Sequence, residues 1–228
     1  MALDLTPPWP WAPSPAWAGR ILALNLDPLA FAHPGHWRRL VEPALAARLS
    51  KQPRVRAGFL RWLRAQLVLP EEYCFDFTAP ARRLVLLETA DLRRVLRLAA
   101  LALAAPVFRR LVRPAERIPL QAQLGEDALN FVLHRAALYR WPENLPRPEI
   151  SLDALAHDMA ATEDRLLAAV THDYPAPLAR RLQLRFPPGE HHPAPAAEAT
   201  GLDPEAAWHL LSTIGTREIN PELQPCFA

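Results

Sequence analysis

The stretch FDFTAPARRLVLLETADLRRVLRL, residues 75–98, places two arginine doublets around an apolar run and the start of a helix. The apolar run, residues 84–87, is too hydrophobic to be left in water. We therefore expect Arg82 and Arg83 to lie at the rim of a core, with packed stems and free guanidinium groups. This layout is typical of a surface that binds another macromolecule and does not resemble a reaction centre.

The second half of this stretch predicts an amphipathic helix. Thr89 is a good N-cap, and Asp91 in the first turn complements the helix dipole. At 100° per residue the charged and apolar side chains fall on opposite arcs: Arg93, Arg94 and Arg97 against Leu92, Val95, Leu96, Ala99 and Leu103. Residues 98–105 carry no charge on any face, so we expect the second half of the helix to be buried all round and to form the central core helix.

An earlier helix is predicted to open at Pro53, a residue suited to the first helical position. Its apolar residues mark one stripe and its arginines another side: Val55, Phe59, Trp62, Leu63 and Leu67, with Arg54, Arg61 and Arg64 opposite.

Three further helices are predicted after residue 120. Gly125 ends or kinks one segment, and Glu126 and Asp127 open the next, which runs to about Arg140 with Ala128, Phe131, Val132 and Leu138 inward. Ser151 caps a long amphipathic helix with Leu152, Leu155, Met159, Leu166 and Val170 at three-and-four spacing. A last helix starts at Asp203 and buries Ala207, Leu210, Leu211 and Ile214, either against its own domain or in a groove of a partner.

These patterns predict an all-α fold, a single irregular helical domain with proline-rich N-terminal and C-terminal extensions. Residues 73–77 are the only plausible strand, and seven glycines are too few for the turns of a large sheet. We expect four parts along the chain: a Pro/Trp-rich leader at 1–19, a helical domain at 20–185, a proline-rich linker at 186–202, and a C-terminal helix and tail at 203–228.

The charge is unevenly distributed along the chain. The net charge is +2, but residues 1–120 carry 18 basic and 9 acidic side chains, giving +9, whereas residues 121–228 carry 8 and 15, giving −7. The two halves can attract each other, or each can face a partner of opposite sign. Only Lys51 among the 26 basic residues is lysine, for which arginine-rich codon usage is the simpler explanation.

The sequence is that expected of a soluble cytosolic protein. Cys74 and Cys226 are far apart and lack metal-ligand spacing, so we expect reduced thiols. The N-terminus has no basic region and too many prolines for a signal peptide. The most apolar stretch, residues 95–108, is interrupted by Arg97 and Pro106 and is too short to span a bilayer.

No pattern predicts an enzyme, a cofactor or a metal site. Asp153 and His157 are one helical turn apart, but a metal site needs three or four ligands. None of the four serines lies in a GxSxG elbow, and no phosphate-binding glycine loop exists. Basic helical nucleic-acid binding is the alternative reading, because arginines crowd the first half, although no helix-turn-helix or ribonucleoprotein signature accompanies them. It predicts steeply salt-dependent retention on DNA or RNA.

Several segments together resemble the SctK family (YscK-like) of the type III secretion injectisome. Over residues 21–140 they are Asn25 to Pro28, Phe31 to Pro34 with Trp37, Phe75 to Phe77, Arg82 to Leu87, Leu92 to Arg94, Leu124 to Glu126, and Phe131 to Leu133. The central segment from Phe75 to Arg94 resembles the family most.

The resemblance implies a mostly helical, non-enzymatic part of the cytoplasmic sorting platform. Such proteins link an SctD-like inner-membrane ring protein to an SctQ-like pod protein, below which an SctL-like stator and the ATPase assemble. It implies a location at the cytoplasmic face of the inner membrane, held through protein partners, with no direct membrane insertion and no nucleic-acid partner. The predicted partner-binding residues are Arg82, Arg83, Arg93, Arg94 and Arg97.

Overall fold

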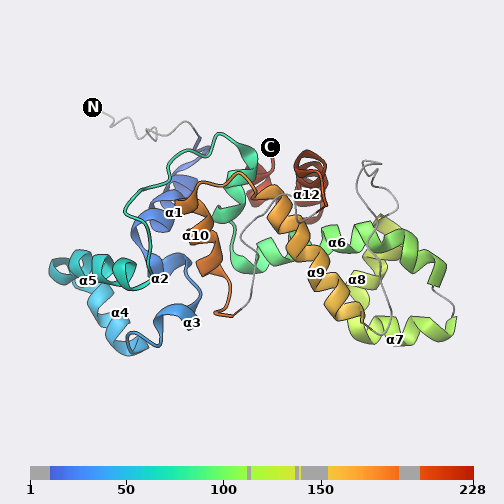
Figure 1. The fold of residues 1–228 in the computed structure, drawn as a ribbon, viewed down its shortest axis with the longest axis horizontal. Coiled ribbons are helices and arrows are strands. Elements are labelled where there is room, and N and C mark those ends of the chain that lie inside the picture. Colours follow the sequence, from blue (N-terminus) through green and yellow to red (C-terminus); the bar gives the residue numbers. More distant parts are fainter. Residues whose placement is uncertain (1–10, 112–113, 137–138, 140–153, 190–200) are drawn as a thin grey trace. The chain divides into compact units, whose positions relative to one another are not determined.

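The fold was obtained as a computed structural model that describes residues 11–111, 114–136, 139, 154–189 and 201–228. The described residues form helices and no strands, which confirms the predicted all-α fold (Figure 1). None of these helices combines the length and the apolar character needed to cross a membrane.

Prolines begin many of the helices, which explains how a chain with 26 prolines is so helical. A proline at the first helical position loses no hydrogen bond, because that N–H has no partner within the helix. The elements that start this way are α1 (Pro15–Leu26), α2 (Pro28–Phe31), α3 (Pro34–Trp37), α4 (Pro43–Lys51), α5 (Pro53–Gln66), η1 (Pro80–Leu86), α7 (Pro114–Leu124), α12 (Pro204–Glu218) and η4 (Pro221–Cys226).

The chain divides into two compact units. The first contains residues 1–89 and 174–191, and the second contains residues 90–173 and 192–228. The four-part division expected from composition follows the tails and linkers instead, and it stays a prediction. Parts of the leader and of the linker, residues 1–10 and 190–200, lie outside the described residues.

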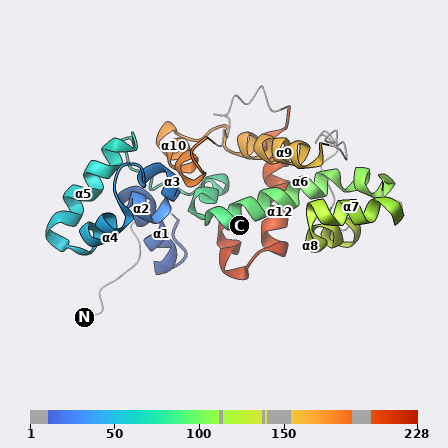
Figure 2. The same ribbon diagram turned by 90° about the horizontal axis from the view of Figure 1, so that it is seen from below.

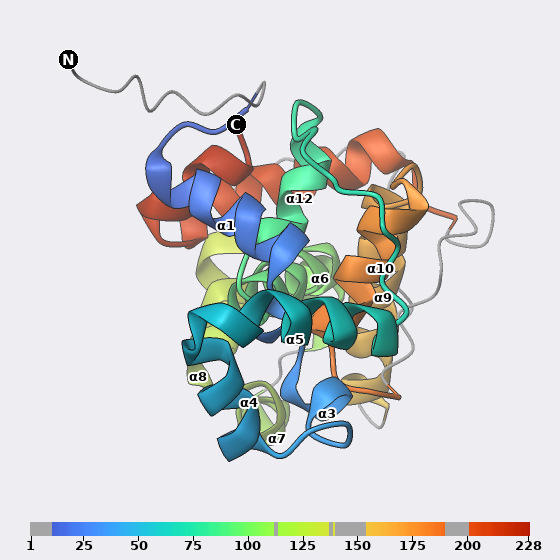
Figure 3. The same ribbon diagram turned by 90° about the vertical axis from the view of Figure 1, so that its left-hand side faces the viewer.

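The first unit packs α1, η1 and α10 (Ala176–Arg185) around a shared core. Ile21 and Leu24 of α1 are shielded from water, as are the four residues 84–87. The apolar run is therefore in the core, as predicted. Pairs of short helices lie on the same unit, with α4 beside α5 (Figure 3). Thr89, at the end of this unit, begins α6 itself, and its hydroxyl donates to the carbonyl of Arg185 at 3.2 Å.

The second unit is built on α6 (Thr89–Leu111), which belongs to it from residue 90. Seven consecutive residues, 99–105, are buried on every face, which confirms the prediction of a central core helix. The apolar arc predicted for its first half is buried too: Leu92, Val95, Leu96, Ala99 and Leu103. The helix α9 (Leu155–Val170) lies beside it (Figures 1 and 2).

The remaining helices of this unit begin close to the predicted positions. Gly125 has a positive φ of 85°, and it separates α7 from α8 (Glu126–Asn130), which continues into the π-helix η2 (Phe131–Arg135). The predicted cap at Ser151 and the inward Leu152 and Leu138 lie outside the described residues.

Residues 73–77 are extended but form no strand, so the strand considered there is wrong. The side-chain amide of Asn25 pairs with Cys74 in the way that a neighbouring strand would. Its Nδ2 donates to the Cys74 carbonyl at 2.7 Å, and its Oδ1 accepts from the Cys74 N–H at 2.7 Å. One buried side chain thus satisfies backbone groups that a sheet would otherwise have to pair.

Candidate partner-binding site

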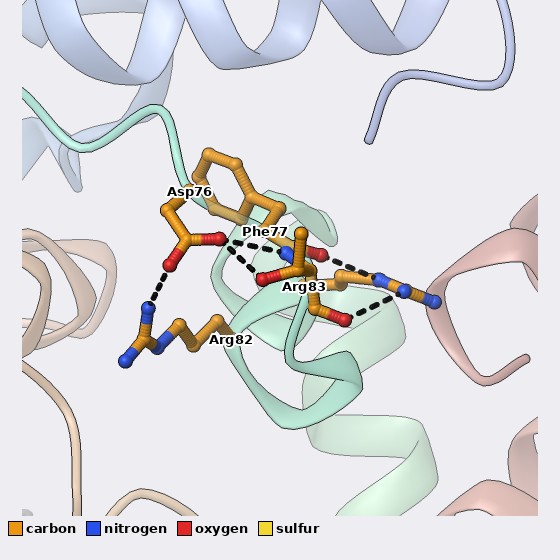
Figure 4. A network of polar contacts seen from close by, with 5 residues as sticks. Asp76, Phe77, Arg82 and Arg83 are labelled. Atoms are coloured by element: carbon orange, nitrogen blue, oxygen red, sulfur yellow. Dashed lines mark hydrogen bonds and ion pairs between the residues drawn. The ribbon is translucent and has the colours of Figure 1, made fainter. Parts of the chain in front are cut away.

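The turn before η1 is held by a single carboxylate (Figure 4). Oδ1 of Asp76 accepts from the Thr78 N–H at 3.0 Å and from the Thr78 hydroxyl at 2.5 Å. Its Oδ2 accepts from Arg82 at 2.6 Å. These hydrogen bonds, those of Thr78 first and that of Arg82 after them, lower the pKa of Asp76 below its ordinary value. The connection from the FDF segment to η1 is therefore held by hydrogen bonds to a charged group.

Arg83 is part of the core, which corrects the expectation that its guanidinium group is free. The residue is 7% exposed, and its Nε donates to the Phe77 carbonyl at 2.9 Å. A second nitrogen donates to the Thr78 carbonyl at 3.1 Å, and the guanidinium lies 4.4 Å from the centre of the Trp11 ring. Arg83 thus joins the turn to a tryptophan of the N-terminal segment.

Arg82 is also engaged, although it is nearer to the surface. Its side chain is 23% exposed, and its ion pair with Asp76 fixes one edge of the guanidinium. The two members of the first doublet therefore differ: Arg83 holds backbone carbonyls inside the unit, whereas Arg82 balances a carboxylate at its surface.

The arginines of α6 lie on one arc, as the helical spacing predicts, but they too differ in their surroundings. Arg93 and Arg94 are exposed. Arg97 is partly covered and forms an ion pair of 3.1 Å with Glu163 of α9. Burial raises the pKa of Glu163 above its ordinary value, and the ion pair with Arg97 opposes this effect.

The five predicted residues do not belong to one compact unit. Arg82 and Arg83 are in the first unit, whereas Arg93, Arg94 and Arg97 are in the second. The most accessible part of the predicted site is the pair Arg93 and Arg94 on the first turns of α6.

The last helix buries its apolar face within its own unit. The four residues predicted to be buried are fully buried: Ala207, Leu210, Leu211 and Ile214. The helix α12 contacts α9 and η4, and Asp203 caps it by accepting from the Ala206 N–H at 3.1 Å. Packing onto its own unit is thus the observed arrangement for this face.

Sequence reasoning missed a buried arginine in the first unit. Arg181 of α10 is 0% exposed, and its guanidinium donates to the carbonyls of Leu24 at 3.3 Å, Pro177 at 2.8 Å and Glu72 at 2.9 Å. It also lies 3.9 Å from the sulfur of Cys74. The partners are mostly backbone groups, which leave no signal in a sequence, and only the apolar neighbours of Arg181 in α10 hinted at its burial.

The described residues contain no group of three or more potential metal ligands. Of the pair weighed above, His157 is exposed on α9, and Asp153 lies outside the described residues. Cys74 and Cys226 are not joined in a disulfide, and burial raises the pKa of Cys74.

These features define an all-α protein that uses arginines both inside its core and on an exposed helical arc. The model of one protein family, described as YOP proteins translocation protein K (YscK), matches residues 34–207, about three quarters of the chain. The chain therefore belongs to the YscK (SctK) family, and it is a type III secretion protein. Comparisons with curated proteins and with solved structures gave no match.

The family match confirms the resemblance drawn from the central segment and extends it beyond residue 140. It begins at α3 and ends within α12, so it includes helices of both compact units. The first two helices, with Asn25 and the turn at Asp27, precede the matched range.

Proposed function

We propose that this protein is a non-enzymatic adaptor of the injectisome sorting platform. It binds an SctD-like inner-membrane ring protein and an SctQ-like pod protein, and through the latter it is connected to an SctL-like stator and the ATPase. It works at the cytoplasmic face of the inner membrane, where its protein partners hold it. The family match over both compact units is the observation that carries this proposal.

The division into two units supports a bridging role. Each unit has a core of its own, the first around α1, η1 and α10 and the second around α6. Each unit can therefore stay folded by itself while it binds a different protein. An adaptor of this kind acts by binding alone, without a chemical step.

The exposed arginines of α6 are the proposed contact of the second unit. Arg93 and Arg94 present two cations from neighbouring positions of a helix whose other side is core. An acidic surface on a platform protein would complement them, and charge complementarity at an interface contributes to the association rate and to specificity. Arg97 extends the same arc but already balances Glu163.

Reversal of this charge tests the proposal. The variant Arg93→Glu with Arg94→Glu is expected to lose co-purification with one platform partner and to keep the other, while the helical circular dichroism signal is unchanged. The matched control is Arg38→Glu with Arg39→Glu, an exposed doublet that changes the net charge by the same amount. If all partners stay bound to the α6 variant, the proposed contact is wrong.

A further inference from the structure

A groove of about 830 Å³ lies entirely within the first compact unit. One wall is α5, whose lining residues repeat at three-and-four spacing from Pro53 to Ala65. The end of α1 and the segment that follows α5 complete the lining with Leu26, Asp27, Leu69, Glu71 and Tyr73. Because α5 has 14 residues, this wall is about 21 Å long.

The groove has an apolar base and apolar side chains that are open to water. Leu60 and Leu69 are 8% and 9% exposed and form the base. Leu26 and Tyr73 are 44% and 51% exposed, large values for side chains of their size. An apolar side chain that enters here would remove this surface from water.

Three arginines of α5 line the groove, and their side chains differ in the partners that they contact. Arg56 forms an ion pair of 3.1 Å with Asp27. Arg64 donates to the Tyr73 hydroxyl at 3.1 Å and to the Pro70 carbonyl at 3.3 Å, and it lies 4.8 Å from the centre of the Tyr73 ring. It is thus fixed in position, and no carboxylate in the described part of the chain pairs with it.

Arg61 completes this set. It is exposed, and it forms no hydrogen bond or ion pair with the residues that the structure describes. Ala57 and Ala65, also exposed, lie one helical turn before and one turn after Arg61 on this wall. Small residues at these positions allow another backbone to approach α5 closely.

We propose that this groove binds an acidic amphipathic helix of a partner protein. Carboxylates of that helix would pair with Arg61 and Arg64, and one of its apolar side chains would cover Leu26, Leu60 and Tyr73. Charge complementarity selects this occupant. The lining has three arginines against Asp27 and Glu71, Asp27 already pairs with Arg56, and Arg61 and Arg64 have no carboxylate partner among the described residues. A helix laid in such a groove presents carboxylates and apolar side chains from one face. The inference rests on the proposed function in that the partner is a platform protein.

Binding of designed peptides to the full chain tests this directly. The probe is a labelled helical peptide of about 18 residues with Leu at three-and-four spacing and Glu on the flanking positions, long enough to be helical. One control peptide replaces every Glu by Lys, and another replaces every Leu by Ala. The Glu/Leu peptide is expected to bind, and each control is expected to bind at least about tenfold more weakly.

Three variants connect the binding to the groove. Arg61→Glu is expected to lower the affinity for the Glu/Leu peptide by at least about tenfold. Arg54→Glu makes the same charge change on an exposed residue of α5 outside the groove, and it should leave the affinity within about twofold. Ala57→Trp fills the groove without changing charge and should weaken binding as Arg61→Glu does.

The inference is overturned if the Glu/Leu peptide does not bind, if the Lys peptide binds equally well, or if Arg61→Glu and Arg54→Glu act alike. Tighter binding of a single-stranded DNA that is lost in Arg61→Glu would assign the groove to nucleic acid instead. Self-association that the same variant abolishes would assign it to a second copy. Either result contradicts the proposal.

Failure of this inference can be separated from failure of the proposed function. If SctD-like and SctQ-like proteins bind the Arg61→Glu and Ala57→Trp variants as well as the unchanged chain, the groove is not their contact and the adaptor function stands. If the Glu/Leu peptide binds as expected but neither protein binds the unchanged chain, the groove stands and the adaptor function fails.

Discussion

At the scale of single residues, the surroundings of each arginine decide its role. Arg83 and Arg181 are buried and donate to backbone carbonyls, so they hold segments of the first unit together. Arg93 and Arg94 are exposed on α6, where we propose that they contact a partner. The guanidinium group suits both uses, because it offers five donors in a plane and carries its charge on a long apolar stem.

The first doublet offers a comparison between neighbours. Arg83→Ala leaves the Phe77 and Thr78 carbonyls without their donor and removes a contact with Trp11, so the free energy of unfolding is expected to fall by about 2–3 kcal/mol. Arg82→Ala breaks an ion pair with a largely exposed carboxylate and is expected to cost less than about 1 kcal/mol. Chemical denaturation measures both. Equal losses would contradict the different roles assigned to the two arginines.

Arg181 is expected to be among the most sensitive positions of the first unit. Arg181→Met keeps much of the side-chain volume but leaves the carbonyls of Leu24, Pro177 and Glu72 without this donor, so the unfolding free energy should fall by about 3 kcal/mol. Arg54→Met on exposed α5 is the control and should stay within about 0.5 kcal/mol of the unchanged chain. Equal unfolding free energies for the two variants would show that the hydrogen bonds of Arg181 do not stabilise the first unit.

At the scale of elements, helical periodicity predicted the long helices well, because α6 and α12 separate apolar and charged residues over several turns. It did less well for α5. Phe59, Leu63 and Leu67 are buried as the predicted stripe requires, but Val55 and Trp62 of the same stripe are 40% and 43% exposed. Periodicity shows which residues share an arc and gives no indication of how much of that arc a neighbouring element covers.

The helix α3 and the end of α10 are connected by a histidine that makes stability depend on pH. The His36 Nε2 lies 2.8 Å from the Phe186 carbonyl. Burial lowers the pKa of His36 below its ordinary value of 6.5, the hydrogen bond to Phe186 opposes this, and the nearby charges of Arg180, Arg39 and His33 add to the lowering. The folded chain therefore takes up this proton at a lower pH than the unfolded chain does.

The sign of the effect follows from this difference. The contribution of neutral His36 is fully present above pH 6.5 and is lost as the pH falls through the lower folded-state pKa. Unfolding free energies measured from about pH 8 to about pH 5 should therefore decline less steeply for His36→Gln, whose amide can still donate to Phe186. Identical slopes for the variant and the unchanged chain would show that another group causes the decline.

The packing of α12 against the C-terminal residues predicts that one substitution destabilises the unchanged chain but stabilises a variant of it. A Cβ at Gly215 would overlap the ring of Phe227, and that ring stacks on Trp208 with centroids 6.5 Å apart. Gly215→Ala should therefore destabilise the second unit, although alanine favours a helix by about 1 kcal/mol over glycine. In a Phe227→Ala background the same substitution should stabilise. Thermal unfolding of the unchanged chain, the two single variants and the double variant measures this. Destabilisation by Gly215→Ala in both backgrounds would exclude the clash as the cause.

At the scale of the whole molecule, the sequence predicted the fold class and the family, and the partner-binding site stays a prediction. The core helix α6 was predictable because a stretch without charge follows an amphipathic one. The pairing of residues 73–77 with a side chain and not with another strand was not predictable, because the side chain is that of Asn25, 49 positions before Cys74. The groove beside α5 escaped prediction for the same reason, since Leu26 and Tyr73 meet α5 only in the folded unit.

The central claim is that the chain joins two proteins of the secretion platform. Its most direct test is light scattering coupled to gel filtration of the chain mixed with the cytoplasmic domain of an SctD-like protein and with an SctQ-like protein. The account predicts one peak with the mass of a complex of all three, and no complex of the two partners when the chain is left out. Partners that compete for the chain, or that associate without it, would contradict the bridging function.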